Sequence, residues 1–255
     1  MSDFDYDLTP PKPTLTYAQW HNGKQQLEPL GGIAFTGGLL IEADQIKEGI
    51  PTFTRETVLL NRKKVEVFSS TDLEFALLAR RRRYFTRTDE GAKYFSVAEY
   101  ETAKAQGVPL RGHCQAAVIL KSFPDQIFYL TFTGTADRAF TAEIKRMVEE
   151  GLPFTTQKQD GNSYTMPLHA FWLRLTPKAH EVVGQGQNKS EVTNPSLNLP
   201  DQFTREFMLS RYVGRENLAR FNSLLPDLAS WANAWQQNNE SDLADVHESE
   251  QAAKA

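Results

Sequence analysis

Four consecutive arginines are followed by two aromatic residues in the run Arg80–Phe85. Guanidinium groups neutralise phosphates and aromatic rings stack on nucleobases, so a surface that binds nucleic acid needs both kinds of side chain close together. A cluster of arginines is also typical of a solvated face or of structural ion pairs. The run makes nucleic acid the first partner to consider and leaves a purely structural role open.

Other cations and aromatic residues alternate with apolar positions on the strands that the sequence predicts. This alternation is expected of a groove across a small sheet or barrel, where cations follow the phosphates and rings receive the bases. Each of these side chains, taken alone, also has a simpler interpretation as surface or core. The residues that we expect to line the groove are Arg62, Lys63, Lys64, Arg80, Arg81, Arg82, Arg83, Tyr84, Arg111, Lys121, Tyr129, Trp172 and Arg174.

The sequence signals for catalysis are weaker than those for nucleic-acid binding. A catalytic or metal site needs a nucleophile beside a base, paired carboxylates, or ligands at a fixed spacing. His113 and Cys114 are adjacent, so on a strand they point to opposite faces. Cys114 is the one cysteine, which excludes an internal disulfide and a cysteine-cluster metal site. We expect no enzyme, no cofactor and no metal, although residues distant in sequence can still converge in a fold.

The composition is that of an ordinary globular protein, with 40% hydrophobic and 24% charged residues in a chain of 255. No apolar stretch approaches the length that spans a bilayer. Met1–Thr9 is acidic and lacks the basic start and apolar block of a secretory signal. We therefore expect a cytoplasmic protein that does not act in a membrane.

The net charge of −4 is unevenly distributed along the chain. The segment 236–255 alone carries −4, because it has five acidic residues against Lys254. The five acids are Glu240, Asp242, Asp245, Glu248 and Glu250. Such a tail can simply solubilise the protein, or it can occupy a basic groove or recruit a partner protein.

Two structures are open for the segment that carries the arginine run. Thr71 and Glu74 have the spacing of a capping box and would start a short helix. The alternative is a continuous strand from Phe75 to Thr86. On a strand, Arg80 and Arg82 face away from Arg81 and Arg83, so one pair only could line a given groove.

Several β-rich runs surround this segment. Thr57–Leu60 and Val65–Phe68 predict a hairpin with a cationic tip. Cys114–Lys121 and Ile127–Thr133 predict a second hairpin, with the four-residue turn Phe123–Gln126 between them. The remaining expected elements are a helix over Arg138–Glu150, a strand over Leu168–Thr176, a long loop over Gly184–Pro200 and a last strand over Phe207–Val213.

Two helical patterns follow Gly214, over Glu216–Leu225 and Asp227–Gln237. They share an apolar stripe that must pack either on the body of the protein or on a partner, and we favour the body. The stripe consists of Leu218, Phe221, Leu224, Leu228, Trp231 and Trp235.

The sequence thus predicts an α+β protein with a mainly antiparallel β-sheet or an open barrel of the oligonucleotide-binding (OB) type, followed by a helical C-terminal part. Its expected parts are a disordered acidic and proline-rich arm (1–14), a β-rich core domain (15–213), a helical extension (214–237) and a disordered acidic tail (238–255).

A set of short strings gives the chain a resemblance to known proteins. They are Arg80–Phe85, Arg111–Gln115, Leu130–Ala136 with Phe140, Phe171–Leu173 and Arg211–Gly214. Over Tyr17–Trp235 the chain resembles uncharacterised proteins of bacterial chromosomes, plasmids and phages, a family with no assigned catalytic residues. In layout it is similar to phage-type single-stranded DNA-binding proteins with an acidic tail. It departs from them at Gln251–Ala255, which has no terminal aromatic residue.

The expected function is sequence-tolerant, non-catalytic binding of single-stranded nucleic acid, with DNA favoured over RNA. Duplex recognition is less favoured because no helix-turn-helix, zinc finger or basic zipper is visible. The main alternative is a structural or adaptor protein whose cations bind an acidic protein partner, with the C-terminal helix or acidic tail as a further contact. An enzyme with an unrecognised site comes third.

Overall fold

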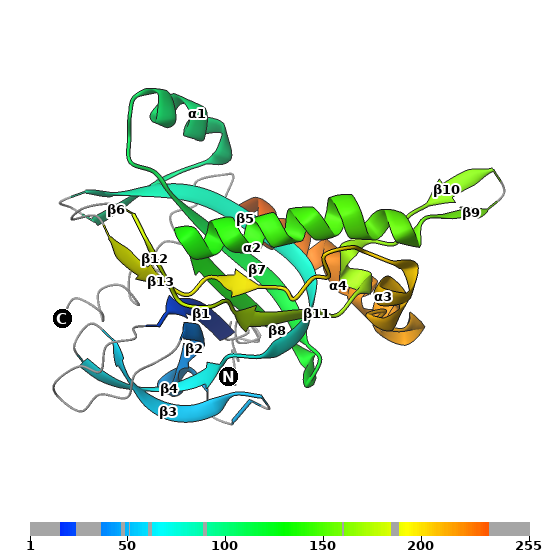
Figure 1. The fold of residues 1–255 in the computed structure, drawn as a ribbon, viewed down its shortest axis with the longest axis horizontal. Helices are drawn as coiled ribbons and strands as arrows, with labels where there is room; N and C mark the ends of the chain where they lie inside the picture. Colours follow the sequence, from blue (N-terminus) through cyan, green and yellow to red (C-terminus); the bar gives the residue numbers. More distant parts are fainter. Residues whose placement is uncertain are drawn as a thin grey trace, which may run out of the picture.

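The computed structural model describes residues 16–23, 37–46, 49–50, 52–60, 63–88, 91–159, 161–184 and 189–234 (Figure 1). Within them the protein is α+β, with one large sheet that is mostly antiparallel. The ten strands of this sheet are β1 (Thr16–Asn22), β2 (Gly37–Glu42), β3 (Thr54–Leu60), β4 (Lys63–Ser70), β5 (Leu73–Thr88), β6 (Gly91–Phe95), β7 (Arg111–Leu120), β8 (Phe123–Thr133), β11 (Leu173–Pro177) and β14 (Pro195–Ser196).

The strand order is β14-β11-β5-β7-β8-β1-β2-β4-β3, with β6 paired to the far end of β5. All of these pairs are antiparallel except β1 with β8. The described strands leave the sheet open at β14 and β3, so they do not close into a barrel. The predicted fold class is confirmed at this level, as an α+β protein with a mainly antiparallel sheet.

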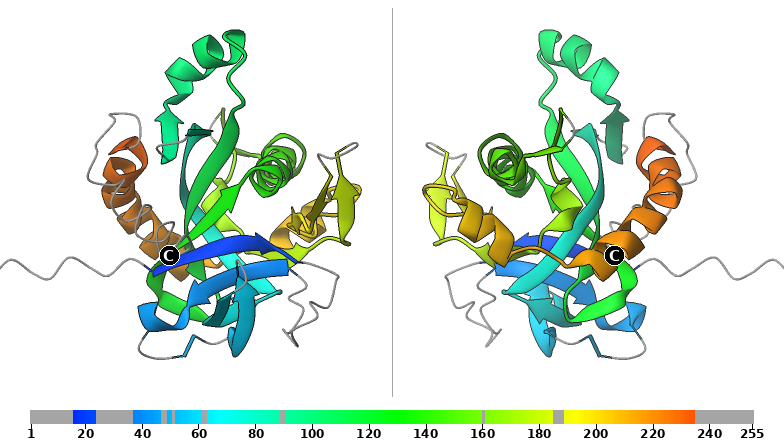
Figure 2. Two further views of the ribbon diagram at one scale, coloured as in Figure 1. Left: turned by 90° about the vertical axis from the view of Figure 1, so that its left-hand side faces the viewer. Right: turned by 90° about the vertical axis from the view of Figure 1, so that its right-hand side faces the viewer.

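The centre of the sheet is formed by three long strands, β5, β7 and β8. Every residue of β7 from His113 to Leu120 is buried, although its side chains alternate between the two faces. A strand buried on both faces must be covered on both sides. Here α2 (Thr135–Arg146) covers one face and α4 (Arg215–Ala234) covers the other (Figure 2).

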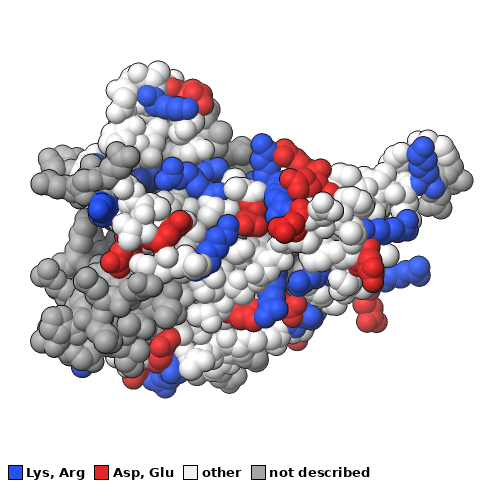
Figure 3. Space-filling view, in the orientation of Figure 1, with Lys and Arg blue, Asp and Glu red and all other residues white. Residues whose placement is uncertain are grey.

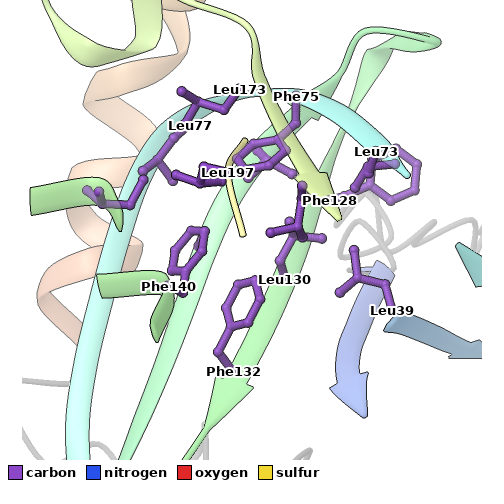
Figure 4. Packing of buried hydrophobic residues seen from close by; sticks show 14 of the residues in the cluster. Leu39, Leu73, Phe75, Leu77, Phe128, Leu130, Phe132, Phe140, Leu173 and Leu197 are labelled. Carbon is purple, nitrogen blue, oxygen red and sulfur yellow. The ribbon is translucent and has the colours of Figure 1, made fainter. Parts of the chain in front are cut away.

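The larger core lies on the α2 side of the sheet. Phe132 of β8 stacks on Phe140 of α2 with ring centroids 4.1 Å apart. Phe75 of β5 and Leu130 of β8 complete this fully buried layer (Figure 4). Burying each such side chain contributes about 1.5–3 kcal/mol, so α2 is held mainly by this apolar contact.

A second core joins α4 to the other face. Phe221 and Leu228 of α4 are buried against Ala117 and Ile119 of β7. The structure has a single helix that continues through Pro226, so the prediction of two separate helices is wrong. A proline inside a helix removes one hydrogen bond, and the apolar contacts on either side of it hold the helix together.

A β-bulge in β5 decides which arginines face which side. The pairing of β5 with β7 shifts by one residue between Leu77 and Ala79. Before the bulge, the odd-numbered Phe75 and Leu77 pack into the α2-side core. After it, the odd-numbered residues lie on the α4 side, beginning with Ala79.

One part of the fold has no counterpart among the predicted elements. Strand β6 and helix α1 (Val97–Ala105) form a lobe that projects beyond the end of β5 (Figure 1). The helix begins with a capping box, in which the Ser96 hydroxyl accepts from the Glu99 backbone N–H and the Glu99 carboxylate accepts from the Ser96 N–H.

Other predictions require correction. Phe207–Val213 is not a strand, because Arg205–Ser210 forms helix α3, which Thr204 caps and which buries Met208. Leu168–Thr176 begins with a 3-10 turn at Leu168–Ala170, and β11 starts only at Leu173. The loop Gly184–Pro200 contains β13 (Ser190–Val192) and β14 in its described part.

The prediction of a hairpin formed by β7 and β8 is confirmed, but the predicted position of its turn is wrong. Strand β8 already begins at Phe123, so Lys121 and Ser122 make the turn. The helix predicted over Arg138–Glu150 is confirmed as α2, continued by a π-helical turn at Met147–Gly151 and a 3-10 turn at Leu152–Thr155. Of the two structures left open for the segment with the arginine run, the strand is correct, and the short helix after the Thr71 and Glu74 capping box does not form.

Two small hairpins lie outside the main sheet, β9 (Gln157–Gln159) with β10 (Asn162–Tyr164) and β12 (Glu181–Val183) with β13. The single-turn 3-10 helix Ala43–Gln45 follows β2. Within the described ranges, no helix has the length and apolar character needed to cross a membrane.

Candidate nucleic-acid interface

The arginine run lies on β5, and the strand divides it into two pairs. Arg81 and Arg83 are 6% and 4% exposed and face the α4 side of the sheet. Arg80 is exposed and Arg82 is partly exposed on the α2 side. The expected alternation is therefore confirmed, and the four cations belong to two different surfaces.

On the α2 side, Arg82 is anchored by the first turn of α2. Its Nη2 donates to Oδ2 of Asp137 at 2.8 Å, and that carboxylate is fully buried. Burial raises the pKa of Asp137, and the charges of Arg82 and Arg80 act against this shift. Gly112 leaves the space for this pair, because a Cβ there would lie 1.8 Å from Asp137 Oδ2.

Aromatic rings continue the surface from Arg82 outward. The Arg82 guanidinium lies 5.1 Å from the ring centroid of Tyr84. Tyr84 stacks on Tyr100 of α1, with centroids 4.0 Å apart and planes at 28°. On the same helix, Nζ of Lys104 lies 5.4 Å from the Tyr100 ring. We call Arg80, Arg82, Tyr84, Tyr100 and Lys104 the outer row.

The outer row is accessible and has further cations beside it. Arg80 and Lys104 are exposed, while Tyr84 and Tyr100 are partly exposed. Lys93 of β6 is exposed and lies 5.3 Å from the ring of Phe95, which pairs directly with Tyr84. Lys and Arg side chains gather between α1 and α2 on this face of the molecule (Figure 3).

On the α4 side, Arg81 contacts the last turns of α4. Its Nε donates to Oε1 of Gln115 at 2.8 Å, and its Nη1 donates to the backbone carbonyl of Trp231 at 3.1 Å. The guanidinium also lies 4.3 Å from the Trp231 ring centroid. A cation is favourable here because the carbonyl end of a helix dipole is negative.

Arg83 and His113 extend this surface along the sheet. Arg83 lies 5.0 Å from the ring of Tyr94 and directly opposite His113 in the pairing of β5 with β7. Burial, followed by the charges of Arg83 and Arg81, lowers the pKa of His113 to about 3. We call Arg81, Arg83, His113 and Gln115 the inner patch, a buried polar cluster that contains two guanidinium groups.

Two other predicted residues, Tyr129 and Trp172, lie on the same side of the sheet as the inner patch and contact α4. Tyr129 packs between Tyr17 and Trp231, with centroids 5.3 and 4.9 Å away. Trp172 meets Phe221 of α4 edge-on at 5.8 Å. Both rings therefore contribute to packing, and the expected continuous groove is interrupted by the helix.

Two further predicted cations, Arg174 and Lys121, form ion pairs with acidic residues. Arg174 binds both carboxylate oxygens of Asp72, at 2.8 and 2.6 Å. Lys121 pairs with Glu74 at 2.9 Å. These pairs neutralise charge on the exposed surface, so the two cations are weaker candidates for phosphate contact than the outer row.

The remaining predicted residues lie apart from both surfaces or outside the described residues. Arg111 is exposed at the start of β7, opposite Phe85. Lys64 is exposed on β4, which lies five strands away from β5 in the sheet order. Arg62 and the side chain of Lys63 fall outside the described residues.

Sequence reasoning missed Tyr100, Lys104, Lys93 and Phe95. A usable signal was present, since Ser96 and Glu99 have the spacing of a capping box and predict a helix directly after Phe95. Gly91 marks the turn that returns the chain along β5, with a φ of +130°.

The site offers little for catalysis in the part of the chain that is described. Burial raises the pKa of Cys114 to about 12, so its thiol stays protonated and unreactive at neutral pH. Cys114 and His113 lie on opposite faces of β7, as expected. Among the described residues, no three His, Cys, Asp or Glu side chains gather into a possible metal site.

Comparison with known proteins returned no match. No protein-family model, no curated protein and no solved structure matches the chain. Any functional assignment therefore rests on the residues and geometry described above.

Proposed function

We propose that the protein binds single-stranded nucleic acid without strict sequence preference, DNA in preference to RNA, and that the outer row is its contact surface. The observation that carries this proposal is the alternation of cations and rings from Arg82 through Tyr84 and Tyr100 to Lys104 on an accessible surface. Phosphates need the cations, and every base has a face that can stack on a ring, whatever the sequence.

The elements around the outer row suit this role. Strand β5 and helix α1 hold the row from two sides, so the tyrosine stack is fixed before a ligand arrives. Arg82 is oriented by buried Asp137, and Arg80 and Lys104 are the exposed cations of the row. Recognition by an open sheet with rings on its surface is also what we would expect of the OB-like arrangement, which remains part of this proposal.

The cations are tested by the salt dependence of binding. A labelled dT oligonucleotide is titrated with the parent protein and with the double variant Arg80→Ala/Lys104→Ala at several salt concentrations. For single strands, the slope of log affinity against log salt changes by about 0.7 for each phosphate contact. We expect the parent slope to be negative and the variant slope to be shallower by one to two such contacts.

A matched control removes two cations elsewhere. Lys158 on β9 and Arg205 on α3 are exposed and lie on elements far from α1 in Figure 1. Lys158→Ala/Arg205→Ala changes the net charge equally and should leave the slope close to that of the parent. No binding at low salt, or equal slopes for the two double variants, would overturn the proposal.

The rings distinguish nucleic acid from an acidic protein partner. Tyr100→Phe keeps a ring on Tyr84, whereas Tyr100→Ala removes it. Stacking on one base is worth about 1–3 kcal/mol, so the alanine variant should lose about 5- to 150-fold in dT affinity and the phenylalanine variant much less. An adaptor that binds an acidic protein through the same cations would not bind dT in this ring-dependent way.

A further inference from the structure

The ion pair of Arg82 with Asp137 joins the outer row to the interior of the protein. Nη2 of Arg82 donates to Oδ2 of Asp137 at 2.8 Å. The carboxylate is fully buried, whereas the arginine side chain is 26% exposed. A ligand at the surface can therefore contact the cation but not the acid, and a change in the charge of Asp137 changes what the outer row offers to that ligand.

Three elements shape the space around the Asp137 carboxylate. On α2, Oδ1 of Asp137 accepts from Oγ1 of Thr141 at 3.2 Å. On β7, Gly112 lies directly opposite Tyr84 of β5, and a Cβ at residue 112 would overlap the carboxylate and lie 3.1 Å from Nη2 of Arg82. The glycine, the hydroxyl and the arginine thus hold this acid against the guanidinium of the outer row.

We propose that Asp137 is a positioning residue of the nucleic-acid site and sets the net charge of the outer row. Ionised Asp137 balances the charge of Arg82, so the net positive charge of the row comes from Arg80 and Lys104. Protonated Asp137 still accepts from Arg82, and the guanidinium charge then attracts a phosphate of the strand. This inference rests on the proposed function and adds a control of the same surface.

The groups that act on the protonation of Asp137 lie on β5, on β7 and on its own helix. Burial raises the pKa of Asp137, whereas the charge and hydrogen bond of Arg82, the hydrogen bond of Thr141 and the charge of Arg80 lower it. Cys114 of β7 stays protonated, because burial and then the charge of Asp137 raise its pKa to about 12. The net result is a raised pKa, so Asp137 takes up a proton at a higher pH than an exposed aspartate.

Binding of a strand and protonation of Asp137 are therefore coupled. A phosphate at Arg82 favours the state in which the acid is neutral, so the affinity for dT should rise as the pH falls through the pKa of Asp137. One more phosphate contact changes the slope of log affinity against log salt by about 0.7, which corresponds to about fivefold in affinity at about 0.1 M salt.

The test titrates a labelled dT oligonucleotide with the full chain at several salt concentrations, at about pH 8 and about pH 4.5. The slope of the parent should be steeper at the lower pH by one phosphate contact. Asp137→Asn keeps the shape of the side chain without its charge, so this variant should have the steeper slope already at the higher pH. Arg82→Gln removes the cation and should keep the shallower slope at both pH values.

A matched control makes the same exchange in an exposed ion pair. Asp72 accepts from Arg174, and both side chains of this pair are about half exposed. Asp72→Asn should leave the slope close to that of the parent. An equal change of slope in Asp72→Asn and Asp137→Asn would overturn the inference, because net charge and not the outer row would then be responsible.

Failure of this inference and failure of the proposed function give different results. If the parent binds dT at the higher pH with the slope of Asp137→Asn, the inference is wrong and the proposed function stands. The same holds if Arg82→Gln loses slope at the higher pH, because Arg82 would then bind a phosphate while Asp137 is ionised. If the parent does not bind dT at low salt, the proposed function is wrong and the inference with it.

A second measurement follows Asp137 in the parent protein and does not depend on the folding of a variant. Carboxyl-carbon NMR records the titration of the Asp137 side chain with and without dT. Saturation with dT should raise the pKa of Asp137, because a phosphate at Arg82 favours the protonated acid. An unchanged or lowered pKa in the presence of bound dT would overturn the inference.

Discussion

At the residue scale, the position of each arginine on β5 determines what it can do. Arg82 is held by Asp137 and Arg81 by Gln115 and Trp231, so both guanidinium groups have fixed directions. Arg80 is exposed, so its charge is available to a ligand at little structural cost. One run of identical residues thus supplies structural cations and a surface cation.

His113 gives this arrangement a pH signature. Its pKa in the folded protein is about 3, below the ordinary value of 6.5. As the pH falls below 6.5, the unfolded chain gains a proton that the folded protein does not take up until about pH 3, so the free energy of unfolding falls across this window. Above pH 6.5 both states are neutral at this site and it contributes no pH dependence.

We therefore expect His113→Gln to flatten the pH dependence of unfolding between pH 6.5 and 3, by up to about 1.4 kcal/mol per pH unit. Denaturant unfolding of parent and variant at several pH values measures this difference. His169→Gln is the control and makes the same exchange at a histidine whose Nε2 forms a hydrogen bond with Oδ1 of Asn222. If both variants keep the parent slope, His113 is not buried as a neutral group.

The orientation of the arginines and the burial of the predicted aromatic residues could be predicted from the sequence only in part. The division of Arg80–Arg83 into two pairs follows from the two-residue period of a strand. The side that each pair faces cannot be predicted in this way, because it depends on the bulge after Leu77, where the pairing of β5 with β7 shifts. Trp172 and Tyr129 were expected to be ligand platforms, but α4 covers them, and a sequence pattern does not reveal which side of a strand a distant helix will cover.

At the scale of elements, local signals competed with tertiary packing. The apolar residues of Phe207–Val213 suit a strand, but Thr204 caps a helix there and Met208 enters the core, so helix α3 forms. The capping-box spacing of Thr71 and Glu74 is misleading, because Leu73 and Phe75 pair with Leu175 and Leu173 of β11. The true capping box begins α1, which presents Tyr100 and Lys104.

Helix α1 should therefore control the outer row without controlling the fold. Ser96→Ala removes the hydroxyl that accepts from Glu99 and costs about 1 kcal/mol of local stability. We expect faster amide hydrogen exchange in α1, weaker dT binding and a nearly unchanged global melting transition. Thr204→Ala, which removes the corresponding cap of α3, is the control and should leave dT binding unchanged. Equal loss of dT binding in both variants would contradict a specific role of α1 in the binding surface.

At the scale of the whole molecule, the two cores share the same three strands. Phe140 belongs to the core between the sheet and α2, and Phe221 belongs to the core between the sheet and α4. The strands β5, β7 and β8 contribute buried side chains to both. Loss of one layer exposes a buried face of strands that the other layer also needs, so the two layers should unfold together.

We expect Phe140→Ala and Phe221→Ala each to reduce the free energy of unfolding by about 3–5 kcal/mol, as for other buried phenylalanines. In both variants, tryptophan fluorescence and far-ultraviolet circular dichroism should report one coincident transition in denaturant. Val148→Ala, at an exposed position beyond α2, should change the stability by less than about 0.5 kcal/mol.

Separate transitions in the Phe221 variant would mean that α4 is an appended helix, and the inner patch could then open without unfolding of the sheet. A single transition means that the surface beneath the end of α4 stays covered as long as the sheet is folded.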